Sequence, residues 1–305
     1  MTVREAGSVR GGPAGWAFAC VVLAFALAGC GGTEPQPEER GRVVENAYGE
    51  TRVPEDPQRI VTLDPVALLN VLALGERPVG YATAGASGLG LAGDKLDGVE
   101  TVGTETEPSV EKVATLEPDL IVGYTENPKE FSEIAPTVDV PGYDETEWKR
   151  LFRFYGEAVG KGDLAEKKIT RFEEREEDLR GQIGDASVSF VRFGQADVSV
   201  YPTSFSGSVL EELGVERPAN QEFEPGGECC RVLSAEKIPE VDADHIFVGV
   251  DPGGEETLAE YEENPLWARL EGEKTPVDPA AWILPSYPAA DGILDDLEEH
   301  LPRDR

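Results

Sequence analysis

One order of short motifs occurs twice in this chain, and it limits the fold more strongly than any other feature of the sequence. The segment SVEKVATLEPDLIV (Ser109–Val122) nearly repeats as SAEKIPEVDADHIF (Ser234–Phe247), with Ser, Glu, Lys, Asp and Ile at identical spacing. In both halves an apolar strand and a helix that ends at Leu-Gly precede this segment. Because alternating strands and helices favour parallel sheets, we expect two α/β lobes with Rossmann-like sheets, related by pseudo-symmetry.

Local signals place the elements of the first half. Arg59–Leu63 predicts a short strand, and Asp64-Pro65 predicts a helix start, because Asp caps helices well and Pro suits the first helical position. Gly75 is expected to end that helix. Further local patterns predict a strand at Pro78–Ala82, a helix capped by Ser109 and a buried strand at Leu120–Val122.

The second half follows the same order. Val188–Gly194 predicts a strand, the next helix is expected to end at Gly214, and Ile246–Val248 predicts a buried strand. Pro239 lies early in the second copy of the Ser-x-Glu-Lys segment. Because Pro removes a backbone donor, we expect a short turn there in place of a full helix.

A helical pattern links the two halves. Apolar residues recur at helical spacing across Glu145–Ile183, interrupted at Gly160 and Gly162, and nothing after Asp163 breaks the pattern before Gly181. We therefore expect one long, rigid connecting helix of about 20 residues, roughly 30 Å in length. Its charge run, EEREED, is typical of a solvated face.

The N-terminus has the composition of a targeting segment. An apolar run of small residues ends in LAGC at Cys30, too short and too rich in small residues for a stable membrane span. The small pair before Cys30 resembles a bacterial lipobox, which implies cleavage before Cys30 and lipid on its thiol; the alternative is a signal peptide with an incidental cysteine. The expected organisation is a signal peptide at 1–29, a lipid anchor and flexible tether at 30–48, an N-terminal lobe at 49–144, the connecting helix at 145–183 and a C-terminal lobe at 184–305.

The chain is strongly acidic. It carries 60 acidic against 27 basic residues, a formal net charge of −33. Such a surface repels phosphates, so nucleic acid is excluded as a partner. The excess is typical of a solvated surface, suited to a salty medium, and a specific cationic partner is the alternative.

Several motifs together indicate a family. The lipobox, the two lobes, the single connecting helix and segments such as PQRIVTLDP, PSVEKVATLEPDLIVG and LSAEKIPEVDADHIFVG resemble the substrate-binding proteins of ABC importers for iron–siderophore complexes and cobalamin. The resemblance implies an extracytoplasmic, lipid-anchored, monomeric receptor that captures a ferric-siderophore complex and delivers it to a permease dimer. The alternatives are a receptor for cobalamin, another corrinoid or haem, and a lipoprotein that keeps the fold for adhesion or signalling.

The same resemblance gives the repeated glutamates a role. In that family an exposed Glu on each lobe engages Arg residues of the permease, and the matching positions here are Glu111 and Glu236. The alternative is local, because a Glu two residues after a capping Ser stabilises the helix through its dipole by about 0.3–1 kcal/mol.

Candidate ligand contacts lie near the carboxyl ends of the predicted strands, where such sheets bind ligands. Arginines suit an anionic ferric siderophore through charge-assisted hydrogen bonds, and aromatic rings supply apolar walls. An ion pair inside the lobe is the alternative for Arg192, and burial in the core is the alternative for the aromatic residues. The candidates are Arg192, Arg231, Tyr81, Tyr124, Tyr201, Trp282 and Tyr287.

Other kinds of site find little support. The chain has only two His, His245 and His300, too few for a three-His metal site, so iron is expected to arrive already chelated and no resident cofactor is expected. There is no Gly-x-Ser-x-Gly or phosphate loop, and the Gly-rich stretch GASGLGLAG (Gly85–Gly93) is not expected to join a strand to a helix as a dinucleotide-binding loop does, so we do not expect an enzyme. Cys229 and Cys230 lack the spacing of a redox pair.

Overall fold

The computed structural model describes residues 41–84 and 89–301. The predicted signal peptide, Cys30 and the first part of the predicted tether lie outside the described residues. None of the described helices is both long enough and apolar enough to span a bilayer.

The first half forms a parallel sheet of five strands. All adjacent pairs run parallel, and the strand that comes first in the sequence lies at the centre. The spatial order is β5 (Glu100–Thr104), β4 (Gly80–Thr83), β3 (Ile60–Thr62), β6 (Leu120–Val122) and β7 (Thr137–Val138).

The second sheet repeats that order of strands. Its spatial order is β10 (Arg231–Val232), β9 (Val198–Val200), β8 (Val188–Phe193), β11 (His245–Val250) and β12 (Glu273–Val277). The strand that comes first in the sequence, β8, again lies at the centre. The shared order confirms two related α/β lobes. One strand departs from the expected parallel arrangement, because β9 pairs antiparallel with both β8 and β10. Only the segment Gly194–Asp197 joins β8 to β9, which permits a hairpin but not a crossover.

The predicted helix boundaries follow from local capping. Helix α1 (Pro65–Ala73) starts where the Asp64 carboxylate accepts the N–H of Ala67, and Gly75 follows it with φ of +84°. The Ser109 hydroxyl caps α3 (Val110–Thr115) by accepting from Lys112 N–H. In the second lobe the matching segment is a 3₁₀ helix, η4 (Ala235–Val241), with Pro239 inside it, as the early proline predicted.

The segment between the sheets is not one helix. It contains η2 (Glu145–Glu147), α5 (Trp148–Ala158) and the 19-residue α6 (Gly162–Arg180). The expectation of one helix over 145–183 is therefore wrong before Gly162. The chain turns at Gly160, whose φ of +75° suits glycine and whose backbone approaches the Glu55 carbonyl too closely for a side chain.

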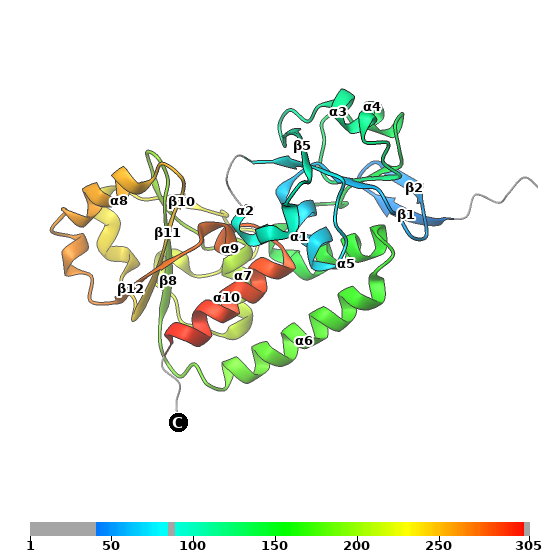
Figure 1. The fold of residues 1–305 in the computed structure, drawn as a ribbon. Helices are drawn as coiled ribbons and strands as arrows, with labels where there is room; N and C mark the ends of the chain where they lie inside the picture. The colour runs from blue at the N-terminus through cyan, green and yellow to red at the C-terminus, as the bar shows by residue number, and fades with distance from the viewer. Residues whose placement is uncertain (1–40, 85–88, 302–305) are drawn as a thin grey trace, which may run out of the picture. The chain divides into compact units, whose positions relative to one another are not determined.

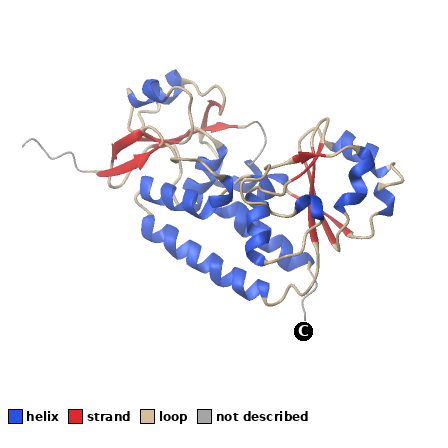
Figure 2. Ribbon diagram, turned by 180° about the vertical axis from the view of Figure 1, so that it is seen from behind, coloured by secondary structure: helices blue, strands red, loops and turns tan. Residues whose placement is uncertain are grey.

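A layer of helices lies between the two sheets (Figures 1 and 2). The C-terminal helix α10 (Tyr287–His300) contacts α1, α5, α6 and α7 (Phe205–Leu213), so it packs on elements of both halves. One hydrophobic core accordingly includes Ile60 from the first sheet, Phe247 from the second and Leu297 from α10. A continuous core of this kind resists independent motion of the lobes.

A hairpin precedes the first sheet and corrects the predicted tether. Strands β1 (Arg42–Asn46) and β2 (Gly49–Val53) pair antiparallel. The Arg42 guanidinium donates to the carbonyl oxygens of Glu157 and Ala158, each at 2.6 Å, which fixes the hairpin to the end of α5. A tether that extends to residue 48 is therefore wrong, because Arg42–Asn46 form strand β1.

The other elements are short. They are α2 (Leu89–Ala92), η1 (Gly93–Leu96), α4 (Pro128–Ser132), η3 (Ala219–Gln221), α8 (Glu255–Glu262), η5 (Trp267–Arg269) and α9 (Pro279–Ile283).

Candidate functional site

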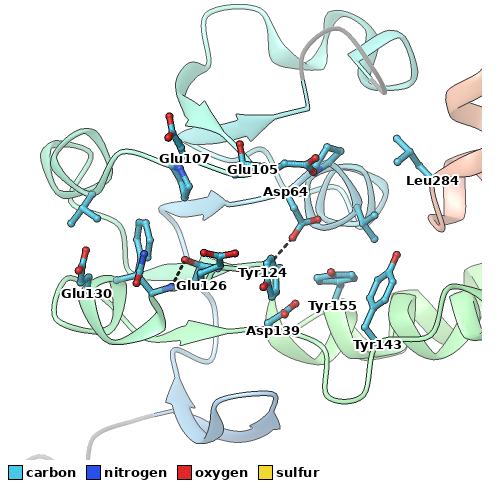
Figure 3. A pocket seen from close by; sticks show the side chains of 18 residues that line it. Asp64, Glu105, Glu107, Tyr124, Glu126, Glu130, Asp139, Tyr143, Tyr155 and Leu284 are labelled. Carbon is cyan, nitrogen blue, oxygen red and sulfur yellow. Dashed lines mark hydrogen bonds between the residues drawn. The ribbon is translucent and has the colours of Figure 1, made fainter. Parts of the chain in front are cut away.

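A pocket opens at the carboxyl edge of the first sheet. Its walls come from the segments that follow β3, β5, β6 and β7, with α5 on one side and Leu284, after α9, on the other (Figure 3). Its volume is about 660 Å³, within the range of small-molecule sites. The position is the one expected for ligands of parallel α/β sheets.

Asp64 joins two of the strand ends that form the pocket. Its carboxylate accepts the backbone N–H of Ala67 and the backbone N–H of Tyr124, each at 2.8 Å. Gly123 makes this approach possible, because its φ is +119° and a Cβ on it would lie 2.4 Å from Asp64 Oδ2. Burial raises the pKa of the Asp64 carboxyl, while the backbone hydrogen bonds oppose that rise.

Tyr48 also holds the segment that follows β6. The backbone N–H of Thr125 donates to the Tyr48 hydroxyl at 2.9 Å, so the β1–β2 turn holds the segment after β6 in place. Tyr48 was not among the predicted site residues, because residue 48 falls within the predicted tether. The alternation around it was the available signal, since Val44 and Val53 are buried while Val43 and Arg52 are not.

The pocket is lined by acidic side chains. Of the described residues that line it, none is Lys, Arg or His, and six carry carboxylates: Asp64, Glu105, Glu107, Glu126, Glu130 and Asp139. Burial, followed by the charge of Asp64, raises the pKa of Asp139 to about 7. The same two causes, in the same order, raise the pKa of Glu105. No local pattern distinguishes these six residues from the other acidic residues, of which the chain has 60 in all.

Tyrosine rings form the rest of the polar wall. Tyr124, a predicted contact, lines the pocket and is 57% exposed. Tyr143 also lines it and is 55% exposed, and the buried Tyr155 contributes from α5. Tyr155 was assigned only to the apolar face of the connecting helix, and Tyr143 carried no signal beyond its position after β7. Exposed rings beside carboxylates can hold a ligand that is partly apolar and partly charged.

Three of the predicted aromatic contacts are instead buried in the second lobe and the shared core. Trp282 is fully buried, stacks between Phe190 and Phe247 with ring centroids 4.9 and 4.7 Å away, and donates from Nε1 to Asp296. Tyr287 stacks on Phe152, and Tyr201 is 7% exposed. Burial leaves these three side chains little surface for a ligand, and the Tyr201 hydroxyl bonds Arg192, so their role as ligand contacts stays a prediction.

Tyr81 does not line the pocket either. It is half-buried and packs against a small apolar cluster that consists of Leu68, Leu69, Leu72 and Ala92. Its position near the end of β4 is as predicted, but its side chain serves the packing of the first lobe.

Both candidate arginines are paired with acidic residues inside the second lobe. Arg192 Nε donates to Asp251 Oδ1 at 3.0 Å, a second guanidinium nitrogen bonds Asp251 Oδ2, and Nη1 lies 2.9 Å from the Tyr201 hydroxyl. Arg231 lies 3.6 Å from Glu228 and 3.9 Å from Glu224. Neither lines the pocket. Their positive charges are therefore balanced within the lobe.

The two repeated glutamates are placed alike. Glu111 lies in the first turn of α3 and Glu236 in the first turn of η4, and both are exposed. Within the part of the chain that the structure describes, neither makes an ion pair, although Lys237 beside Glu236 pairs with Glu240. Both carboxylates are thus available to an external cation.

Two other expectations concern cysteines and metals. Cys229 and Cys230 are exposed free thiols with their sulfur atoms 3.2 Å apart. Among the described residues, no group of three or more His, Cys, Asp and Glu side chains is arranged to hold a metal ion.

Comparisons with known proteins agree with this architecture. Residues 60–274 match the family model described as periplasmic binding protein. The chain is 31% identical over 313 residues to the probable siderophore-binding lipoprotein YfiY of Bacillus subtilis, covering 93% of this chain and 96% of that protein. It is 26% identical to the iron(3+)-hydroxamate-binding protein FhuD of the same organism, over 95% and 98% of the two chains. The structure of Staphylococcus aureus SirA complexed with staphyloferrin B is similar with a TM-score of 0.72, at 26% identity over 85% of this chain and 97% of that one.

Proposed function

Because this chain belongs to the family of periplasmic binding proteins, we propose that it is the extracytoplasmic receptor of an ABC importer and captures a ferric-siderophore chelate. The relatives are named as siderophore- and hydroxamate-binding proteins, and they cover nearly the whole chain. The receptor would deliver the intact chelate to the permease, so that no bond is made or broken.

The observation that carries the proposal is the pocket at the carboxyl edge of the first sheet. Its volume of about 660 Å³ suits a compact chelate, and two exposed rings, Tyr124 and Tyr143, offer apolar surface to it. The core shared by both lobes disfavours large closure. Capture would therefore rely on a preformed surface with modest motion.

Delivery would use the repeated glutamates. Glu111 and Glu236 are exposed, unpaired within the described chain, and carried by corresponding elements of the two lobes. A permease with two related subunits would present one cationic site to each. A lipid on Cys30 would hold the monomeric receptor at the membrane, as the lipoprotein names of relatives suggest.

Ligand titration of the purified chain without its first 30 residues tests the proposal. The panel is a ferric trihydroxamate, a ferric tricatecholate, ferric citrate, cobalamin and haem, each followed by quenching of intrinsic fluorescence. We expect saturable quenching by at least one ferric chelate and weaker binding after Tyr124→Ala. Glu174→Gln is the matched control, because Glu174 is exposed on α6, away from the pocket. Binding of cobalamin or haem alone, or of nothing in the panel, would overturn the proposal.

A further inference from the structure

The pocket concentrates negative charge without an internal counter-ion. Asp64 acts electrostatically on both Glu105 and Asp139, and Glu107, Glu126 and Glu130 line the same pocket (Figure 3). None of these six appears in any ion pair among the described residues, whereas acidic residues elsewhere neutralise Arg175, Arg192 and Lys149. Like charges that share a partly dry site are unfavourable unless a cation joins them.

Asp139 shows this imbalance most clearly. Asp139 is 8% exposed and lines the pocket; a backbone hydrogen bond from Val140 favours its charged form, and no side chain in the described part of the protein pairs with it. Asp64 already uses its carboxylate to cap α1 and to hold Tyr124. Asp139 is therefore a buried carboxyl group with unused acceptor capacity at the wall of the space that a ligand would fill (Figure 3).

The cations that an anionic ligand would need are not available at this site. Arg192 is held by Asp251 and Tyr201, and Arg231 is flanked by Glu224 and Glu228. An anionic chelate would thus meet carboxylates, with no free guanidinium among the described lining residues to compensate. This reverses the expectation from the sequence that arginines would favour an anionic siderophore.

We propose that the pocket selects a ferric chelate of net positive charge, one that carries a protonated amine, over neutral and anionic chelates. The inference rests on the proposed function, because it assigns the class of chelate bound at the same site. The amine would lie against Asp139 and Glu105, which form no ion pair among the described residues, and the apolar body of the chelate would lie on Tyr124 and Tyr143. An ammonium group donates three hydrogen bonds, which matches several carboxylates around one point.

A matched pair of probes isolates the amine. The ferric complex of desferrioxamine B has a free protonated amine and a net positive charge, and the ferric complex of its N-acetylated form is neutral with nearly the same shape. A ferric tricatecholate serves as the anionic probe. Affinities are measured at pH 8, where Asp139 is ionised. They are measured again near 1 M salt, where a Debye length of about 3 Å removes the field of distant surface charges.

We expect the free amine to improve affinity about tenfold or more over the acetylated complex, with the tricatecholate weakest. In the variant Glu105→Gln/Asp139→Asn this advantage falls below about threefold, while affinity for the acetylated complex is kept. Glu105→Gln alone provides a variant at an exposed position that leaves folding intact, and it lowers the advantage in part. Glu174→Gln leaves the preference unchanged.

Two results would overturn the inference while leaving the proposed function in place. One is equal or tighter binding of the acetylated complex, and the other is tightest binding of the tricatecholate. Failure of every ferric chelate to bind would instead overturn the proposed function itself, and this inference with it.

Discussion

Substituting Gly123 tests the link between backbone geometry and the pocket. Gly123 has φ of +119°, where a side chain is strained by about 1–3 kcal/mol. A Cβ would also lie 2.4 Å from Asp64 Oδ2 and 3.2 Å from Ala67 Cβ. Asp64 would have to move, which weakens its bonds to two backbone N–H groups, and one such bond to a charged group contributes about 1.5–3 kcal/mol. We therefore expect Gly123→Ala to lower the free energy of unfolding by about 3–5 kcal/mol.

Gly49→Ala is the matched control for this substitution. Gly49 has a similar φ of +109°, but a Cβ there would meet nothing within 4 Å. The control therefore reports the backbone strain alone, and the difference between the two variants reports the displacement of Asp64. Urea unfolding of both variants measures that difference, expected to be about 2 kcal/mol, and the affinity for a ferric chelate should fall only in Gly123→Ala. Equal stability of the two variants would refute the argument that Asp64 requires a glycine at this position.

Three further predictions test the charges, the core and the docking surface. Burial, followed by the charge of Asp64, raises the folded pKa of Asp139 to about 7, so the native state keeps a proton that the unfolded state loses, and stability falls as pH rises from about 4 to about 7. Asp139→Asn should therefore be more stable than the parent at pH 8, by at most about 4 kcal/mol, with little difference at pH 4, as urea titrations at both pH values would show. Trp282→Ala should cost about 3–5 kcal/mol of stability, whereas Tyr124→Ala should weaken ligand binding with little effect on unfolding; the opposite pattern would contradict the placement of these rings. Reversing Glu111 and Glu236 to Arg should abolish uptake in cells while ligand affinity stays unchanged, and loss of affinity would show that the two residues serve the fold instead.

Much of the fold is predictable because its signals are local. Asp64-Pro65 begins α1, Ser109 caps α3 and Gly214 ends α7 with φ of +72°, each by chemistry confined to a few residues. The repeated order of motifs extends this to two sheets with the same strand order. The reversed strand β9 could also have been predicted, because the connection before it is too short for a crossover.

The site was harder to predict because it depends on which strands become neighbours. Arg192 pairs with Asp251 because β8 and β11 lie side by side, with Arg192 opposite Gly249. Trp282 has an aromatic side chain of the kind that often lines ligand clefts, but the packing of α10 encloses it. The carboxylates of the pocket are dispersed over four loops in a chain rich in Glu and Asp, so only the fold distinguishes Asp139 from the rest.

The position of bound iron tests the central claim most directly. A crystal of the chain grown with a ferric chelate that quenches its fluorescence would locate the metal by the anomalous scattering of iron. We expect one strong peak inside the pocket, bounded by Asp64, Tyr124 and Tyr143 at the carboxyl edge of the first sheet. A peak beside Arg192 and Arg231, with the pocket filled only by water, would contradict the account.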